Sequence, residues 1–321
     1  MTRKLLAALA GSLLLLATDA LAQAWPNKPI KLIAPYPPGS QADVVSRYFA
    51  EKLSAALGQQ VIVENKPGAQ GMVGAEMAKN AAPDGYTFVY VDSSMMCINP
   101  YVYKQVPYDS VRDFAPVTQH GLAPLVMVTP PSLGPKSMKD FLAWARERRG
   151  KVKYASSGNG SPSHIWGEGL NRVETLDMTH VPYKGAGPAI QDTLAAHIPM
   201  TIQDLAAVGP SISGGKLTPL AVTSKVRWPR LPGVPTFQQE GYYFGPAGWN
   251  GIMAPLGTPD KITERMSAEI RKLVQTSEGK EKLLDVGLIA TGTTPHEMGL
   301  IVGTDCRNWR AAAKYTGIEP E

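Results

Sequence analysis

The sequence predicts an α/β fold, because segments patterned as strands alternate with segments patterned as helices from residue 30 onward. The strand segments are short apolar runs, and the helix segments repeat apolar residues at every third or fourth position. This alternation favours largely parallel sheets. With 321 residues, the chain is long for a single hydrophobic core and gives room for two lobes.

In the first part of the chain, strands are predicted at residues 30–34, 60–64 and 86–91, and helices at residues 44–57 and 72–81. Gly58 ends the first helix as its C-cap. A polar loop at residues 92–94 follows the third strand, and ligands of open α/β sheets bind outside such strand ends. Ser93 and Ser94 are therefore candidates for ligand contact, although their hydroxyls could equally bond their own backbone.

A change of structural unit is predicted near residues 122–129, an apolar stretch that ends at two prolines. In the second unit, a helix is predicted at residues 137–150 and strands at residues 152–155, 180–183, 198–203 and 217–223. Residues 249–255 are predicted as a strand that returns to the first unit, with helices following at residues 260–276 and 295–315. The predicted lobes are residues 23–123 with 247–321, and residues 124–246.

The N-terminus has the pattern of a cleavable secretory signal peptide at residues 1–22. Arg3 and Lys4 supply the charged start, residues 5–17 are apolar, and Ala20-Leu21-Ala22 is a small-x-small cleavage site. The alternative is a signal anchor, which the short apolar run disfavours because it cannot span a bilayer. We therefore expect the protein to be exported.

Charge and cysteine content exclude several classes of function. The net charge of +5 is mild and scattered, and the basic cluster at residues 146–153 reads as the solvated end of a helix, so nucleic-acid binding is not expected. Cys97 and Cys306 are the only cysteines and have no His or Cys neighbours at metal-ligand spacing, so neither a metal nor a cofactor is expected. In an oxidising compartment they form either a disulfide or two buried thiols.

Two loops have the composition of anion-binding sites. Residues 35–43 and residues 156–161 each connect a predicted strand to a predicted helix, and the second loop consists of Ser and Gly with one Asn. Such loops leave backbone N–H groups unpaired at a helix N-terminus, where the helix dipole also favours negative charge. Together they predict an anionic ligand held from two sides, with a plain surface turn as the alternative for each. Asp43 is expected to shape the first loop.

Short motifs along nearly all of the chain after the signal peptide carry a family resemblance. They are Trp25-Pro-Asn-Lys-Pro-Ile30, Pro37-Pro-Gly-Ser-Gln-Ala-Asp43, Val63-Glu-Asn-Lys-Pro-Gly-Ala69, Pro83-Asp-Gly-Tyr86, Tyr154-Ala-Ser-Ser-Gly-Asn-Gly-Ser161, Val181-Pro-Tyr-Lys-Gly185, Gly215-Lys-Leu-Thr-Pro-Leu-Ala221 and Leu231-Pro-Gly-Val-Pro-Thr-Phe237. In order and spacing, the chain resembles the Bug family, the periplasmic solute receptors of tripartite tricarboxylate transporters.

The resemblance implies a two-lobed periplasmic-binding-protein fold, type II-like, with the ligand cleft between the lobes. It also implies a small carboxylate ligand, held through backbone amides, hydroxyls and water, and the membrane permease subunits of the transporter as partners. A periplasmic monomer is expected. The chain departs from the family pattern at Ser40-Gln41-Ala42, at Trp166 and at Gln203, which leaves the ligand type open.

The residues expected to contact the ligand lie in the strand-end loops and their flanks. They are Tyr36, Pro38, Gly39, Ser40, Gln41, Ser93, Ser94, Ser157, Gly158, Gly160, Ser161, His164, Trp166, Tyr183, Gly185 and Asp204. Asp204, at a strand end, could accept a hydrogen bond from a ligand amine or cap the next helix, and His164 could staple its own loop. Trp166 favours an aromatic mono- or dicarboxylate, unless its indole packs in the helix core.

Two other functions fit parts of the pattern. An exported hydrolase or isomerase would use Ser161 and His164, but the sequence has no Gly-x-Ser-x-Gly elbow and no acidic residue that can be named as the partner of the histidine. A ligand-sensing receptor partner would use the same fold and the same site as a transport receptor.

Overall fold

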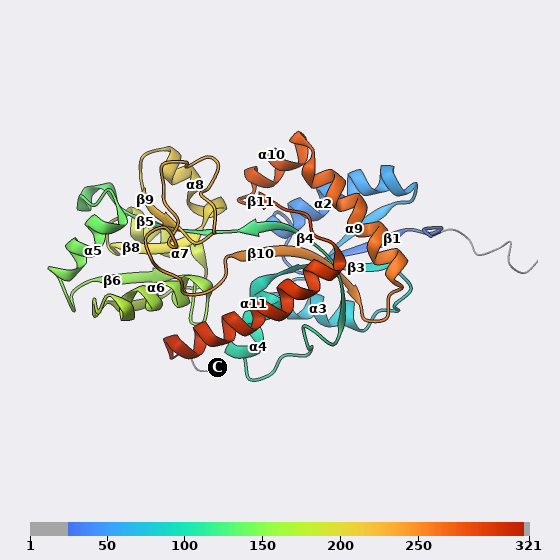
Figure 1. Cartoon of the computed structure of the whole chain (residues 1–321), viewed down its shortest axis with the longest axis horizontal. Coiled ribbons are helices and arrows are strands. Elements are labelled where there is room, and N and C mark those ends of the chain that lie inside the picture. Colours follow the sequence, from blue (N-terminus) through green and yellow to red (C-terminus); the bar gives the residue numbers. More distant parts are fainter. Residues whose placement is uncertain (1–24, 318–321) are drawn as a thin grey trace, which may run out of the picture.

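The computed structural model describes residues 25–317, which form two α/β lobes side by side (Figure 1). Lobe 1 is built on a six-stranded sheet of order β11-β4-β10-β3-β1-β2, and lobe 2 on a five-stranded sheet of order β7-β6-β8-β5-β9. The α/β class and the two-lobed architecture predicted for the chain are confirmed. The predicted signal peptide, residues 1–22, lies outside the described residues.

Lobe 1 takes its elements from both ends of the described chain. Its strands are β1 (Ile30–Ala34), β2 (Val61–Asn65), β3 (Thr87–Asp92), β4 (Phe114–Ala123), β10 (Gly248–Pro255) and β11 (Ile289–Ala290). Its helices are α2 (Gln41–Leu57), α3 (Met72–Lys79), α4 (Asn99–Val102), α9 (Asp260–Gln275), α10 (Ser277–Asp285) and α11 (Pro295–Thr316), with helical turns at Ala69–Gly71 and Ser94–Ile98.

Lobe 2 is formed by the middle of the chain. Its strands are β5 (Leu125–Thr129), β6 (Lys153–Ser156), β7 (Thr179–Pro182), β8 (Met200–Asp204) and β9 (Thr218–Val222). Its helices are α5 (Met138–Arg146), α6 (Pro162–Val173), α7 (Ala186–Leu194) and α8 (Leu205–Ser213), with a helical turn at Pro131–Leu133.

The sheet of lobe 1 is buried on both faces, which explains the continuous apolar runs of its strands. Successive residues of β1 point to opposite faces, so Leu32 packs with Phe49 of α2 while Ile33 packs with Ala75 of α3. Each of these side chains is at most 3% exposed. Helices therefore cover both sides of the sheet and leave its strand ends for the cleft.

Strand direction differs from the largely parallel sheets that were predicted. β1 pairs in parallel with β2 and β3, and β6 with β7 and β8, but β10 is antiparallel to β3 and β4, and β5 to β8 and β9. The reason is the connection between the lobes: the chain leaves lobe 1 at the end of β4 and returns to it along β10. Two neighbouring strands that carry the chain in opposite directions are necessarily antiparallel.

Helix α11 joins the two lobes at a further place. It runs from lobe 1 toward lobe 2 (Figure 1), where its C-terminal part packs against α6. The Arg172 side chain of α6 donates hydrogen bonds to the carbonyl oxygens of Tyr315 (3.1 Å) and Thr316 (3.0 Å). These carbonyls belong to the last turn of α11 and lack intrahelical donors, so the guanidinium caps the helix.

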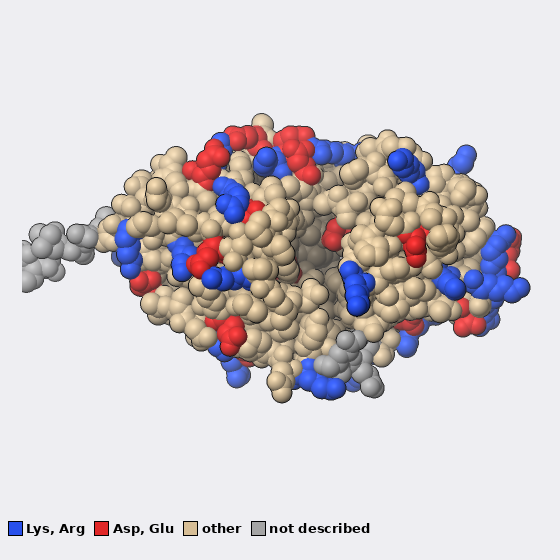
Figure 2. Space-filling model, turned by 180° about the vertical axis from the view of Figure 1, so that it is seen from behind, with Lys and Arg blue, Asp and Glu red and all other residues tan. Residues whose placement is uncertain are grey.

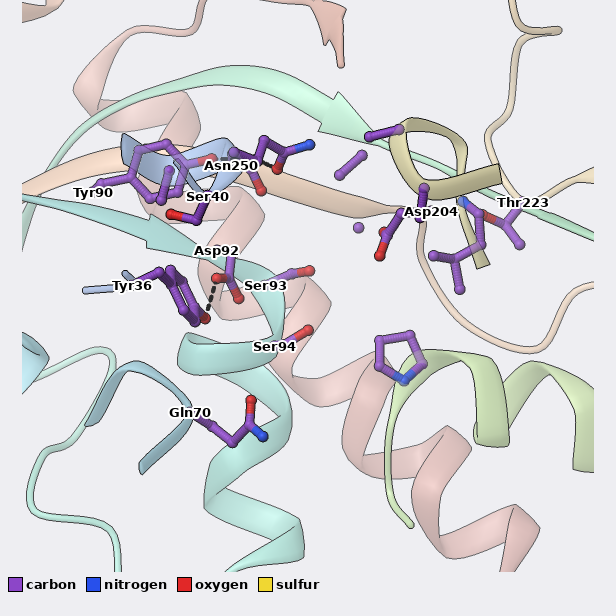
Figure 3. A pocket seen from close by; sticks show the side chains of 18 of the residues that line it. Tyr36, Ser40, Gln70, Tyr90, Asp92, Ser93, Ser94, Asp204, Thr223 and Asn250 are labelled. Atoms are coloured by element: carbon purple, nitrogen blue, oxygen red, sulfur yellow. Dashed lines mark hydrogen bonds between the residues drawn. The ribbon is translucent and has the colours of Figure 1, made fainter. Parts of the chain in front are cut away.

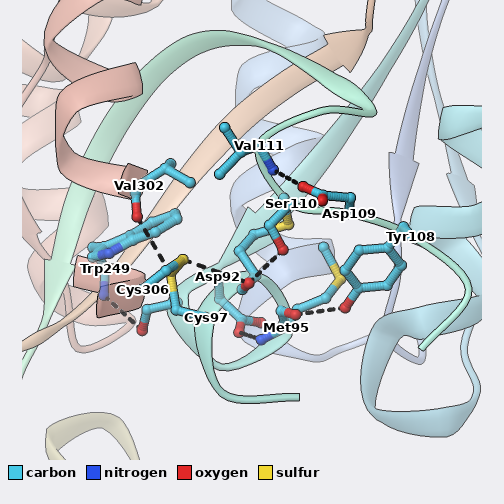
Figure 4. Close-up of a disulfide and its surroundings, with 12 residues drawn as sticks. Asp92, Met95, Cys97, Tyr108, Asp109, Ser110, Val111, Trp249, Val302 and Cys306 are labelled. Carbon is cyan, nitrogen blue, oxygen red and sulfur yellow. Dashed lines mark hydrogen bonds between the residues drawn. A yellow bond between two sulfur atoms is a disulfide. The ribbon is translucent and has the colours of Figure 1, made fainter. Parts of the chain in front are cut away.

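Cys97 and Cys306 form a disulfide (Figure 4). It links the turn Ser94–Ile98, which follows β3, to α11, and so fixes the segment that begins with the predicted contact residues Ser93 and Ser94. The same segment is held by Tyr108, whose hydroxyl donates to the carbonyl oxygen of Met95 at 2.5 Å. Of the two alternatives left open by the sequence, the structure shows the disulfide.

Four elements of lobe 1 were not predicted, namely α4, β4, α10 and β11. β4 was missed because Pro116, Thr118 and Gln119 interrupt its apolar pattern, and α10 because its sequence is highly polar. Among the described residues, no helix is long and apolar enough to cross a membrane.

Candidate functional site

Two adjoining cavities, of about 340 Å³ and 810 Å³, lie between the lobes. Gln70, Ser94, Leu125, Pro162 and Asp204 line both of them. We call the smaller one the inner cavity and the larger one the outer cavity. The hollow between the lobes is visible from the back of the molecule, and its walls are mostly uncharged (Figure 2). The strand-end loops of both sheets therefore face one cleft.

Most of the residues that the sequence singled out line this cleft. Those lining the inner or the outer cavity are Tyr36, Ser40, Gln41, Ser93, Ser94, Ser157, Gly158, Gly160, Ser161, Trp166, Tyr183, Gly185 and Asp204. Pro38, Gly39 and His164 do not line either cavity. The sequence analysis missed Gln70, Tyr90, Asp92, Thr223 and Asn250 as lining residues. Of these, Asp92 had a readable signal, since it directly follows a predicted strand and precedes Ser93.

The first loop is organised around a buried carboxylate. Ser40 caps helix α2, its hydroxyl accepting the Asp43 N–H at 3.3 Å, and Asp43 accepts the Gly39 N–H (2.9 Å) and the Asn65 side-chain amide (2.9 Å). Burial alone would raise the pKa of Asp43, but these bonds and the ion pair with Arg47 hold it below its usual value. Asp43 thus shapes the loop as expected, and Gly39 is turned toward it instead of the cleft.

The second loop has fewer free donors than its composition suggested. The Ser163 hydroxyl accepts the Ser157 N–H at 2.9 Å. The Gly160 N–H donates to Nδ1 of His164 at 3.1 Å, and the Ser161 N–H donates to the carbonyl oxygen of Gly158 at 3.2 Å. The expectation that this loop presents several unpaired N–H groups is therefore wrong. Its side-chain hydroxyls and the N-terminus of α6 remain as the polar groups that it offers to the cleft.

His164 holds this loop together, which was the alternative to contact with the ligand. Its ring stacks on that of His180 at a centroid distance of 3.7 Å, and Nε2 of His180 lies 2.6 Å from the Ser156 hydroxyl. Burial lowers the pKa of both imidazoles, that of His180 to about 4 with a further contribution from His164. The Ser161 hydroxyl donates to the carbonyl of Gly158 at 2.7 Å and is thus engaged within the loop.

Two carboxyl groups, one from each lobe, line the inner cavity (Figure 3). Asp92, at the end of β3, accepts hydrogen bonds from the Tyr36 hydroxyl (2.5 Å) and the Met95 N–H (2.9 Å), while burial raises its pKa. Asp204, at the end of β8, is exposed toward the cleft, yet the surrounding walls desolvate it. That desolvation, together with the charge of Asp92, raises the pKa of Asp204 to about 6.

Asp204 precedes helix α8 but does not cap it, because its side chain makes no capping hydrogen bond. Gln41 and Asn250 are fixed from lobe 1: the Asn250 amide donates to the Gln41 side-chain oxygen at 2.6 Å, and the Gln41 amide donates to the carbonyl of Val286 at 2.6 Å. Within lobe 2, the hydroxyl of Tyr183 donates to Asp192. Asp204 thus caps no helix, and its carboxyl group bonds its own backbone N–H.

Trp166 packs in the core of lobe 2, which was the alternative to a ligand-stacking role. Its indole is 1% exposed and lies 5.0 Å from the ring of Phe237 and 5.7 Å from that of Phe244, between ring centroids. Trp166 contributes to the wall of the inner cavity, but it presents no open flat face. The argument for an aromatic ligand therefore loses its main support.

The two lobes touch on both sides of the cleft. Gly160 of lobe 2 lies against Val102 of lobe 1 so closely that an added Cβ would come within 2.4 Å of Cγ1. Arg230 of lobe 2 forms ion pairs with Glu281 and Asp285 of lobe 1. The lobes therefore contact each other beside the cavities. Among the described residues, no group of three or more His, Cys, Asp or Glu is arranged to hold a metal ion.

Comparison with known proteins places this architecture in one family. The sequence model described as tripartite tricarboxylate transporter family receptor matches residues 45–311. Protein BugT of Bordetella pertussis is 32% identical over 95% of this chain and 94% of its own length. The structure of Rhodopseudomonas palustris Rpa4515 with adipate superposes with a TM-score of 0.80 at 31% identity, covering 92% of this chain and all of that one.

A second solved structure is also similar. MatC from Rhodopseudomonas palustris with bound malate has a TM-score of 0.72 at 25% identity and covers 90% of this chain and 99% of its own. The family match spans most of the chain, and the relatives share its two-lobed fold. The chain therefore belongs to the tripartite tricarboxylate transporter receptor family of solute-binding proteins, as its sequence motifs indicated.

Proposed function

We propose that this chain is a non-enzymatic periplasmic receptor that captures a small carboxylate and delivers it to the membrane permease subunits of a tripartite tricarboxylate-type transporter. The observation that carries the proposal is the cleft, because residues of both lobes line its two cavities and the lobes contact each other beside them. The similar structures with adipate and malate support a carboxylate as the ligand class.

Export to the periplasm is supported from two directions. The signal-peptide pattern of residues 1–22 predicts secretion, and the Cys97–Cys306 disulfide is typical of an oxidising compartment. In the receptor that we propose, residues 23–123 with 247–321 and residues 124–246 act as two rigid bodies. A ligand that contacts both would favour the closed form, and the receptor would work as a monomer.

The rival enzyme would need Ser161 as a nucleophile and His164 as its base. Nδ1 of His164 instead accepts the Gly160 N–H, and the Ser161 hydroxyl caps helix α6 by accepting the His164 N–H at 3.3 Å. Both groups serve the loop, which favours binding over catalysis. A ligand-sensing partner would have the same site, so a pull-down from membranes that contain the permease is the experiment that separates sensing from transport.

Thermal unfolding and calorimetric titration against a panel of acids would test the proposal. The panel contains succinate, adipate, malate, citrate, glutamate, benzoate and phthalate, and mass spectrometry checks that each acid is recovered unchanged. A ligand at a hundred times its Kd should stabilise the protein by about 2.7 kcal/mol. Turnover of the acid, or the absence of binding by every member, would contradict a carboxylate receptor.

A matched pair of variants places the binding in the cleft. The Ser94 hydroxyl lines both cavities, and Ser94→Ala should lower the affinity about five- to a hundredfold if it bonds the ligand. Ser132→Ala removes the same hydroxyl from an exposed turn of lobe 2 and serves as the control. Equal affinities for the two variants would remove Ser94 from the site.

A further inference from the structure

The inner cavity has an unusual charge for the site of an anionic ligand. Among the described residues that line it, two are carboxylic acids, Asp92 and Asp204, and none is Lys or Arg. The two side chains come from opposite lobes and face the same space (Figure 3). A carboxylate placed here would meet like charge from both sides, with no protein cation to offset it.

The two carboxyl groups differ in how the protein holds them. Asp92 accepts bonds from Tyr36 and from the Met95 N–H, which fixes its position. Asp204 makes no capping bond to α8, and its carboxyl group accepts a hydrogen bond from its own backbone N–H. The two lobes thus place a carboxylate that can accept further hydrogen bonds beside a fixed one, and a half-enclosed polar group of this kind calls for a partner.

The outer cavity has the opposite character. It is lined by the hydroxyls of Ser157 and Ser161 and by Lys184, whose side chain is exposed. Asp204 lies where the two cavities meet, because it lines both. The cleft therefore changes along its length from an acidic end in the inner cavity to a hydroxyl-rich and basic end in the outer cavity.

A buried donor on the wall of the inner cavity also lacks a partner. Trp309 is 1% exposed and lines the cavity, and its indole Nε1 has no hydrogen-bond acceptor among the described residues. Buried donors without an acceptor are rare in native proteins. This nitrogen has almost no accessible surface, however, so the polar group that a bound molecule can engage here is the Asp204 carboxylate, which calls for a hydrogen-bond donor.

Resting on the function proposed above, we propose that the ligand is a carboxylic acid that also carries an amine or another cationic nitrogen. The nitrogen lies between Asp92 and Asp204, and the carboxylate extends toward Ser157 and Lys184. The two aspartates are then the residues that select amino acids or amino-substituted acids over simple carboxylates, because only the former neutralise the acidic end of the cleft.

The charge of Asp204 makes this selection dependent on pH. Its pKa is raised to about 6 by desolvation and by Asp92, so the preference for an amine should strengthen as the pH rises through that value. The titratable or charged side chains that line the same two cavities are Tyr36, Tyr90, Asp92, Tyr103, Tyr183 and Lys184. The ligand amine stays protonated throughout this range.

Matched pairs of acids test the proposal on the full-length mature protein. Calorimetry at pH 7.5 compares 4-aminobutyrate with butyrate, glutamate with glutarate, and 4-(aminomethyl)benzoate with 4-methylbenzoate. We expect the amino member of the binding pair to bind at least tenfold more tightly. Asp92→Asn and Asp204→Asn should each reduce this ratio at least fivefold, whereas Glu240→Gln, an exposed change of the same charge, should leave it unchanged.

The possible failures are distinguishable. If simple acids bind as tightly as their amino counterparts, or if both Asn variants keep the wild-type ratio, this inference is overturned while the carboxylate receptor stands. If simple acids bind more tightly as the pH falls below 6, and Asp204→Asn abolishes that trend, then protonated Asp204 donates to the carboxylate and the inference is wrong. If no member of any pair binds, the proposed function fails as well.

Discussion

The two walls of the cleft are held by different chemistry. In lobe 1, the loop at residues 35–43 is fixed by the charged Asp43, and the turn after β3 is fixed by a disulfide. In lobe 2, the Ser/Gly loop is fixed by neutral groups, namely the Ser163 hydroxyl and the stacked rings of His164 and His180. A loop rich in Gly and Ser therefore does not by itself present free donors, because its own helix can use them first.

The largest expected effect concerns the disulfide of the lobe 1 wall. The Cys97–Cys306 bridge closes a loop of 209 residues, and the chain-entropy model gives ~5 kcal/mol for a loop of that size. The double variant Cys97→Ser/Cys306→Ser should lose most of that free energy of unfolding in urea titrations. A loss below about 1 kcal/mol would mean that packing around α11, rather than the bridge, holds this wall.

Removal of the Asp43 carboxylate should have the next largest effect. Asp43→Ala leaves the Gly39 N–H and the Asn65 amide without their acceptor. The free energy of unfolding should fall by about 2–3 kcal/mol, with little of this from the ion pair because Arg47 is exposed. Asp43→Asn, which keeps an acceptor oxygen, should cost less. Because the folded pKa of Asp43 is lowered, its contribution is present above the unfolded pKa and is lost as the pH falls through the folded value.

The lobe 2 wall should lose folding stability at a higher pH than the lobe 1 wall as the solution is acidified. The pKa of His180 is lowered to about 4 in the folded protein, against about 6.5 when unfolded. Between these values the unfolded chain binds more protons, so stability rises with pH and is lost as the pH falls from about 6.5 to about 4. We expect the free energy of unfolding of the wild type to fall by about 1–3 kcal/mol over this range. In His180→Asn the free energy of unfolding should depend less on pH. Identical profiles for the two proteins would contradict the neutral stacked pair.

The contact between the lobes should give the smallest effect. Arg230 pairs with Glu281 and Asp285 on the surface, and such pairs typically contribute less than 1 kcal/mol and weaken with salt. Arg230→Ala should therefore reduce ligand affinity by no more than about fivefold, and less at 0.5 M salt. A loss above a hundredfold would show that this pair, and not the ligand, drives closure.

The elements of the cleft could be predicted from the sequence where loops follow strands. Ser40, Ser94, Ser161 and Asp204 all lie at strand ends or helix starts, and the structure places them on the walls of the cleft. Tyr90 and Asn250 could not be found in this way, because they lie within strands whose pairing is antiparallel and distant in sequence. The prediction of unpaired N–H groups in residues 156–161 was wrong. Composition does not reveal which acceptors inside the protein will bond the N–H groups of a loop.

A crystal structure of the complex with the tightest acid from the titrations tests the central claim most directly. The account predicts one molecule in the cleft, in contact with Ser94 and Asp92 of lobe 1 and with the Ser157–Ser161 loop of lobe 2. A ligand that touches only one lobe, or that binds outside both cavities, would contradict the claim that closure of the two lobes forms the binding site.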